Sequence, residues 1–143
     1  MKKLIFILVA FIGIQGISMA QCSDELLGVC YPAIGNYKFL KSYPIKMKKS
    51  KKGQPPGVAQ NSIVLNAGVT YRVTPCNASE YEGKLVVSLY SGDAMVSSSY
   101  DPKSKTHYPG FEFQCRKSGV YYLSFYFDEG LEGCGMVLLS QKN

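Results

Sequence analysis

The sequence predicts an all-β protein: an antiparallel two-sheet sandwich of jelly-roll or Greek-key type, with about eight strands and a short N-terminal helix. Short runs of β-branched and aromatic residues recur after residue 36, each bounded by Gly, Pro, Asn, Asp or Ser. The links between them are too short for crossover helices, which favours antiparallel pairing. Eight strands in about 100 residues are too many for one sheet with a solvated back, so we expect two sheets packed face to face.

The first 20 residues are typical of a secretory signal. Lys2 and Lys3 precede an apolar run over residues 4–12, and Ser18 and Ala20 are small residues at the positions that a signal peptidase reads. The run is shorter than the roughly 20 residues that a membrane-spanning helix needs. We therefore expect an exported protein, periplasmic or extracellular, without a transmembrane span.

Cleavage after Ala20 would leave Gln21 as the first residue and Cys22 as the second. A lipoprotein signal needs a small residue directly before the anchored cysteine, and Gln21 is not small. We therefore expect Cys22 to carry no lipid.

Residues 21–143 fit a single β-sandwich domain, long enough to bury a core without oligomerising, and we expect a monomer. The formal net charge of the whole chain is +6. Much of the positive charge is local, in the segment KMKKSKKGQPPG at residues 46–57, which reads as a long exposed loop whose lysines discourage edge-to-edge pairing. A polyanion-binding patch is the alternative. No aromatic residues interleave with these lysines, so we expect no nucleic-acid partner.

The elements follow in order along the chain. Ser23 can cap a helix over residues 24–30, where Asp24 and Glu25 favour the positive end of the helix dipole, and Gly28 keeps that helix short. The helical period then disappears, and the predicted strands are residues 37–47, 62–66, 69–75, 83–91, 94–100, 110–115, 119–127 and 133–140.

Alternation along the strands assigns side chains to faces. In residues 83–91 and 119–127 it places one set towards the core, namely Leu85, Val87, Leu89, Tyr121, Leu123, Phe125 and Phe127. Tyr90, Tyr122 and Tyr126 then point outward, and Tyr100 and Tyr108 lie near His107 in a turn-rich loop. These five tyrosines are the candidate binding residues, because exposed rings stack on sugars or anchor a protein partner. The alternative is ordinary cross-strand packing.

Five cysteines in an exported chain predict disulfides and one unpaired thiol. If consecutive strands alternate in direction, Cys76 and Cys134 lie at one end of the sandwich and Cys115 at the other. Cys115 and Cys134 would then be about 25 Å apart, beyond the limit of about 7 Å between bonded Cα atoms. We therefore expect Cys76 to bond to Cys134 and Cys115 to Cys22, with Cys30 buried or free.

The sequence offers two weaker chemical sites. His107, the only histidine, or a Cys30 thiolate could serve a small hydrolase or thiol enzyme, although no nucleophile motif accompanies either residue. Three acidic residues of one loop could bind calcium with help from Asp93 or Asp101; they are Asp128, Glu129 and Glu132. Their spacing matches no dedicated calcium loop, and an acidic turn kept soluble by its charges is the alternative. We expect no cofactor.

Four segments carry a family resemblance, namely NAGVTYRVTPC, GKLVVSLYSGD, FEFQCRKSGVYYLSFYF and GCGMVLLS. Together they resemble a family of small exported proteins from Bacteroidetes. Their order is also similar to that in pre-peptidase C-terminal β-sandwich domains, over about residues 62–140. Those domains are non-catalytic appendages of exported enzymes, some with sugar- or calcium-binding roles, so the resemblance implies a binding module.

The function that the sequence favours is that of a secreted, non-enzymatic β-sandwich that acts in binding or envelope association, with a protein or glycan ligand. The exported hydrolase or thiol enzyme is the first alternative. A calcium-dependent carbohydrate-binding module is the second.

Overall fold

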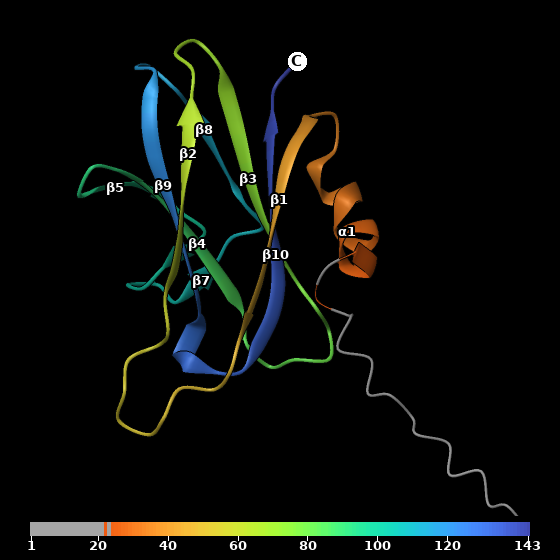
Figure 1. The fold of residues 1–143 in the computed structure, drawn as a ribbon, viewed down its shortest axis with the longest axis vertical. Coiled ribbons are helices and arrows are strands. Elements are labelled where there is room, and N and C mark those ends of the chain that lie inside the picture. Colours follow the sequence, from red (N-terminus) through yellow and green to blue (C-terminus); the bar gives the residue numbers. More distant parts are fainter. Residues whose placement is uncertain (1–21, 23) are drawn as a thin grey trace, which may run out of the picture.

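The computed structural model of the protein describes Cys22 and residues 24–143, so the predicted signal segment, its cleavage site and the Ser23 cap lie outside the described residues. The fold is an antiparallel β-sandwich, as the sequence predicts (Figure 1). Sheet A contains, in spatial order, β1 (Lys38–Met47), β10 (Gly133–Gln141), β3 (Thr70–Asn77) and β8 (Phe111–Gln114). Sheet B contains, in spatial order, β2 (Ala59–Leu65), β9 (Gly119–Phe127), β4 (Leu85–Ser91) and β5 (Ala94–Ser98).

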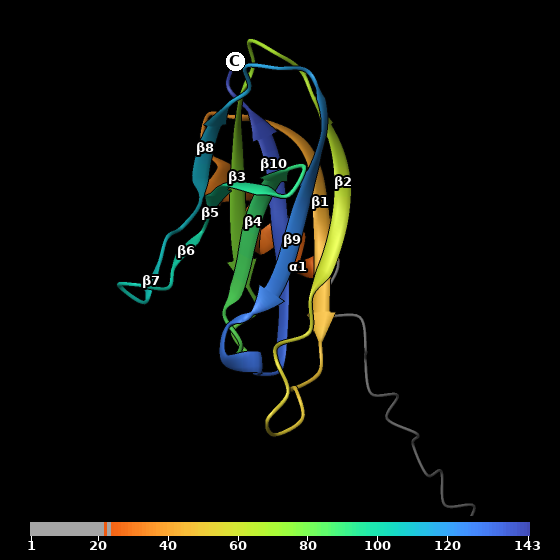
Figure 2. The same cartoon turned by 90° about the vertical axis from the view of Figure 1, so that its left-hand side faces the viewer.

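The strand order is that of a jelly roll. The chain passes from one sheet to the other at every main connection except β4 to β5, and β1, the first strand, pairs with β10, the last. Figure 1 shows the two sheets edge on, and Figure 2 shows the face of sheet B with sheet A behind it. A two-stranded ribbon of β6 (Tyr100–Asp101) and β7 (Thr106–His107) projects from the sandwich, where the sequence indicated only a loop.

The main core fills the space between the sheets. The predicted inward residues of β4 and β9 are all buried there, with Leu123 and Phe125 at 0% exposure. From sheet A, Val73 and Val137 contribute to the same cluster. The two-residue alternation along β9 therefore assigned its faces correctly, because successive side chains of a strand point to opposite faces.

A second, smaller core lies on the outer face of sheet A. The helix α1 (Asp24–Cys30) and the following 3₁₀ turn η1 (Tyr31–Ile34) pack there, with Leu26 and Ile34 against Met136 and Leu138 of β10. β10 is therefore buried on both faces, in contrast to β9, whose buried and half-buried residues alternate. Among the residues that the structure describes, no helix is both long and apolar enough to cross a membrane.

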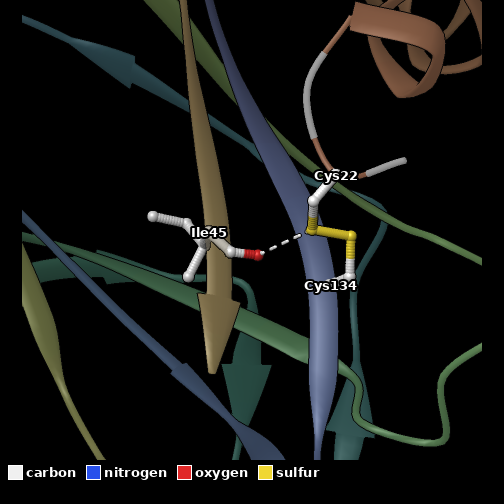
Figure 3. The surroundings of a disulfide bond; sticks show 3 residues. All are labelled: Cys22, Ile45 and Cys134. Carbon is white, nitrogen blue, oxygen red and sulfur yellow. Dashed lines mark hydrogen bonds between the residues drawn. A yellow bond between two sulfur atoms is a disulfide. The ribbon is translucent and has the colours of Figure 1, made fainter. Parts of the chain in front are cut away.

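The disulfide pairing differs from the sequence prediction. Cys22 bonds to Cys134 and Cys30 bonds to Cys76, so both bridges tie the helical segment to sheet A. Figure 3 shows the first bridge beside β1, where the Cys22 Sγ lies 3.6 Å from the carbonyl oxygen of Ile45. One bridge precedes α1 and the other is at its last residue, so the helix is held at both ends.

The predicted Cys76–Cys134 bond is wrong for a geometric reason. Cys76 and Cys134 do lie at the same end of sheet A, but Cys76 is opposite Met136 rather than Cys134. They are therefore diagonal neighbours, whose Cα atoms are typically about 7–8 Å apart and so at or beyond the disulfide limit of about 7 Å. The helix brings a closer partner to each, with Cα separations of 5.7 and 5.8 Å.

The predicted Cys22–Cys115 bond is also wrong. Cys115 is a free, buried thiol that belongs to the main core between the sheets, whereas Cys22 packs on the outer face of sheet A. Sheet A thus separates the two residues. The Cys115 thiol donates instead to the carbonyl oxygen of Lys117 at 3.2 Å.

The lysine-rich connection between β1 and β2 is an exposed loop, although Lys46 and Met47 belong to β1. Its backbone is anchored once, where the Ser50 N–H donates to the carbonyl oxygen of Gly130 at 2.8 Å. No ion pair of the described residues involves the lysines of the loop, which are Lys48, Lys49, Lys51 and Lys52.

Replacing these four loop lysines with serine is expected to change the free energy of unfolding by no more than about 0.5 kcal/mol, because exposed side chains without partners contribute little to stability. Urea unfolding monitored by circular dichroism measures the change. A loss of several kcal/mol would show that the lysines themselves hold the loop, contrary to the single backbone anchor at Ser50.

Candidate functional site

The two outer faces of the sandwich differ in cover and in charge. α1 covers part of the outer face of sheet A, whose strands carry Lys38, Lys41, Lys46, Arg72 and Glu112. None of the residues in β2, β4, β5 and β9 of sheet B is acidic, basic or histidine. On the outer face of sheet B, the outward residues of β2 are exposed, whereas those of β9 are half-buried apart from exposed Val120.

The outer face of sheet B carries three of the candidate tyrosines. Tyr90 and Tyr122 are opposite one another on β4 and β9, and Tyr126 lies further along β9; all three are half-buried. The same face exposes three apolar side chains, with Val64 at 71%, Met95 at 58% and Val120 at 53%. We call these six residues the tyrosine face.

At one end the tyrosine face meets the projecting β6–β7 ribbon. Tyr126 lies close enough to Asp128, Tyr100 and Tyr90 for their charges to affect it; burial first, and these neighbours second, raise the pKa of its hydroxyl. Tyr126 therefore keeps its proton at neutral pH and can donate a hydrogen bond to a ligand.

Ser99 fixes the ribbon to the sheet. It is 1% exposed, and its N–H donates to the carbonyl oxygen of Val87 at 2.9 Å. Its hydroxyl oxygen accepts from the Val87 N–H at 3.0 Å, and its carbonyl oxygen accepts from the Tyr108 N–H at 2.8 Å. Asp101 stabilises the turn at the ribbon's tip, because hydrogen bonds from the Ser104 hydroxyl and the Lys103 N–H lower the pKa of its carboxyl.

Between the ribbon and the turn η2 (Asp128–Gly130) lies an open polar hollow of about 470 Å³. His107 Nε2 lies 2.9 Å from Asp128 Oδ2. The Tyr100 ring packs against the imidazole at a tilt of 38°, with 4.5 Å between centroids. Burial, followed by the charges of Asp128 and Glu129, raises the pKa of Tyr100. The remaining polar lining consists of Glu82, Lys84, Lys105 and Glu129.

The two predicted enzymatic residues, Cys30 and His107, have different surroundings in the structure. Cys30 is bonded to Cys76, so the prediction of a Cys30 thiolate nucleophile is wrong. His107 has the carboxylate partner of a catalytic dyad, but the residues that line its hollow include no serine, threonine or cysteine. The hollow therefore lacks the hydroxyl or thiol nucleophile that such a dyad usually activates.

The predicted calcium ligands do not converge. Asp128 pairs with His107, and the Asp101 carboxylate accepts hydrogen bonds within its own turn. Glu132 lines a different hollow, beside Tyr81. Within the described part of the chain, no group of three or more His, Cys, Asp or Glu side chains could hold a metal ion.

Two features of the site escaped the sequence analysis. The His107–Asp128 pair joins residues 21 positions apart, and no spacing rule connects them. The absence of charge from every strand of sheet B was hidden by the predicted strand at 83–91, which includes Lys84. The structure begins β4 at Leu85 and places the four uncharged strands in one sheet.

The fold and this surface define the protein as a disulfide-bonded jelly-roll β-sandwich with an uncharged aromatic face. No family model matches the sequence, and no curated protein matches it. Among solved structures, it is similar to PliG of Aeromonas hydrophila, a periplasmic lysozyme inhibitor of g-type lysozyme. The similarity has a TM-score of 0.46 and 16% sequence identity, and covers 76% of this chain and 90% of that chain.

Proposed function

We propose that this chain is an exported, non-enzymatic protein that binds a macromolecular ligand through the tyrosine face. The observation that carries the proposal is the contrast between the two sheets. A disulfide-held helix covers part of one outer face, whereas the other carries half-buried tyrosines and exposed aliphatic side chains without a single charge in its strands. Two disulfides support export, because such bonds persist in oxidising compartments.

The shape of the surface favours a large ligand. A small molecule is usually enclosed by a deep and largely apolar pocket. Here Tyr90, Tyr122 and Tyr126 lie on a broad sheet face, and the adjoining hollow is open and lined with charged groups. Tyrosine rings on such a face offer apolar area together with a hydroxyl that hydrogen-bonds, a combination suited to glycan rings and to protein surfaces.

Replacing Tyr90 and Tyr122 with serine is expected to weaken binding by about thirty-fold, since truncating central aromatic contacts costs about 2 kcal/mol. The measurement is a binding screen of the oxidised protein against glycans and envelope components, followed by calorimetry on the hits. The matched control replaces Val29 and Tyr31, which are exposed on the helical segment, and should leave affinity unchanged. Equal losses in both variants would remove the tyrosine face as the site.

The His107–Asp128 pair supports a second candidate function, hydrolysis with water as the nucleophile. An aspartate that accepts from one imidazole nitrogen leaves the other free to act as a general base. Turnover of a ligand found in the screen, abolished by His107→Ala but not by the tyrosine changes, would favour this function over simple binding.

A further inference from the structure

The four edge strands of the sandwich are not equally protected against pairing with another chain. β1 carries Lys38, Lys41 and Lys46, a proline at Pro44 and a register shift beside Leu40. β8 has only four residues, one of them Glu112. β5 has five residues and a register shift against β4. Charges, proline, bulges and shortness are the devices by which natural edge strands avoid association.

β2 has none of these devices. It is seven residues long, contains no charged residue and no proline, and pairs with β9 in one unbroken register from Ala59 to Leu65. Its outer edge is free: β2 pairs only with β9, and the other backbone–backbone hydrogen bonds of the described residues include none from β2. Gln60, Asn61 and Ser62 are exposed.

We propose that β2 pairs with β2 of a second copy of this chain, antiparallel and about a two-fold axis, so that sheet B continues across the dimer. β2 has no charge that would favour an oppositely charged partner. A second copy of the same strand is uncharged as well, and is the partner that every copy of the chain encounters. A two-fold axis lets each strand satisfy the free backbone groups of the other, which makes the contact self-complementary and closed.

The side-chain alternation fixes the register. The outward residues of one strand must face outward residues of the other. In β2 the even-numbered residues point outward, so even-numbered residues must oppose even-numbered ones. Placing Ser62 opposite Ser62 of the second copy meets this condition and pairs all seven residues of β2. Exposed Val64 then lies beside Gln60 of the second copy, so part of its apolar surface is covered.

The lysine loops do not prevent this pairing. The loop lies at the Ala59 end of β2, and antiparallel pairing brings that end to the Leu65 end of the second copy. The two loops are then about 20 Å apart along the strands, at 3.3 Å per residue. That distance exceeds twice the Debye length of about 8 Å at physiological salt, so their repulsion is largely screened.

The dimer contact uses the edge of β2 and does not require the proposed ligand, but it affects the surface that the ligand meets. Because sheet B continues across the axis, the two tyrosine faces lie side by side on one surface. The monomer expected from the sequence rested on chain length, which concerns the core and says nothing about free strand edges.

Sedimentation equilibrium of the oxidised protein tests the proposal. The wild type is expected to show a concentration-dependent dimer. Ser62→Lys and Ser62→Glu should each weaken it by about five-fold, because like charges would face each other across the axis. An equimolar mixture of the two variants should recover association, since opposite charges then meet. The matched control, Ala94→Lys on the exposed β5 edge of the same sheet, should dimerise like the wild type.

A wild type that stays monomeric up to its solubility limit would overturn the proposal. So would a dimer that Ser62→Lys leaves unchanged, or one that Ala94→Lys weakens equally. Failure of the mixture to recover association would refute the register centred on Ser62. Ser62 is exposed, and circular dichroism of each variant checks that the fold is retained.

Discussion

Removing the Cys22–Cys134 disulfide, by changing both residues to serine, is expected to lower the free energy of unfolding by about 5 kcal/mol. The bridge closes a segment of 112 residues, and chain-entropy estimates give that value for a loop of this length. The Cys30–Cys76 bridge spans 46 residues, and its removal is expected to cost about 4 kcal/mol. Guanidinium unfolding of the oxidised proteins measures both changes.

The cysteine variants also check the pairing. Cys30→Ser and Cys76→Ser should destabilise equally, because each breaks the same bond. The control is Cys115→Ala, which removes a small buried group without breaking a bridge and should cost only about 1 kcal/mol. Non-reducing peptide mapping gives a separate readout: a linked peptide of Cys76 and Cys134 would contradict the observed pairing.

Phe125→Ala is expected to cost about 4 kcal/mol, the largest effect that we predict for a single substitution in the core. The ring is completely buried at the centre of the main core, where it packs on Tyr43 with 5.9 Å between centroids. Losing a large buried ring removes apolar burial and leaves a cavity, which typically costs 3–5 kcal/mol. Thermal or denaturant unfolding of the oxidised protein measures it.

The control for this variant lies three residues earlier on the same strand. Tyr122 points to the outer face of sheet B and is half-buried, so Tyr122→Ser should cost no more than about 1 kcal/mol. Similar losses for Phe125→Ala and Tyr122→Ser would mean that the two faces of β9 are packed alike, and would contradict the assignment of its core face.

Most strands could be predicted from the sequence because their signal is local. The strand predicted at 119–127 has the same bounds as β9. Its nine residues include both the glycine that begins the strand and the full alternation of inward and outward side chains. β2 was predicted from residue 62, three residues late. Ala59, Gln60 and Asn61 have no strong strand preference, and pairing with Phe125, Ser124 and Leu123 of β9 makes them strand.

The cysteine partners could not be predicted from strand direction alone. Strand direction correctly placed Cys76 and Cys134 at one end of the sandwich, but direction gives only the end and not the lateral offset between two residues. The docking of α1 on sheet A decided which sulfur atoms could meet. That docking depends on apolar residues of β10 which point away from the main core, such as Met136 and Leu138.

Local patterns were enough to predict the class of fold, the faces of the central strands and the outward position of Tyr90, Tyr122 and Tyr126, because each depends on a few neighbouring residues. The cysteine partners, the His107–Asp128 contact and the free edge at β2 became visible once the sheets and the helix were packed together. These features join residues far apart in the chain. Their meeting is set by how sheets and helix pack, and no local pattern encodes that arrangement.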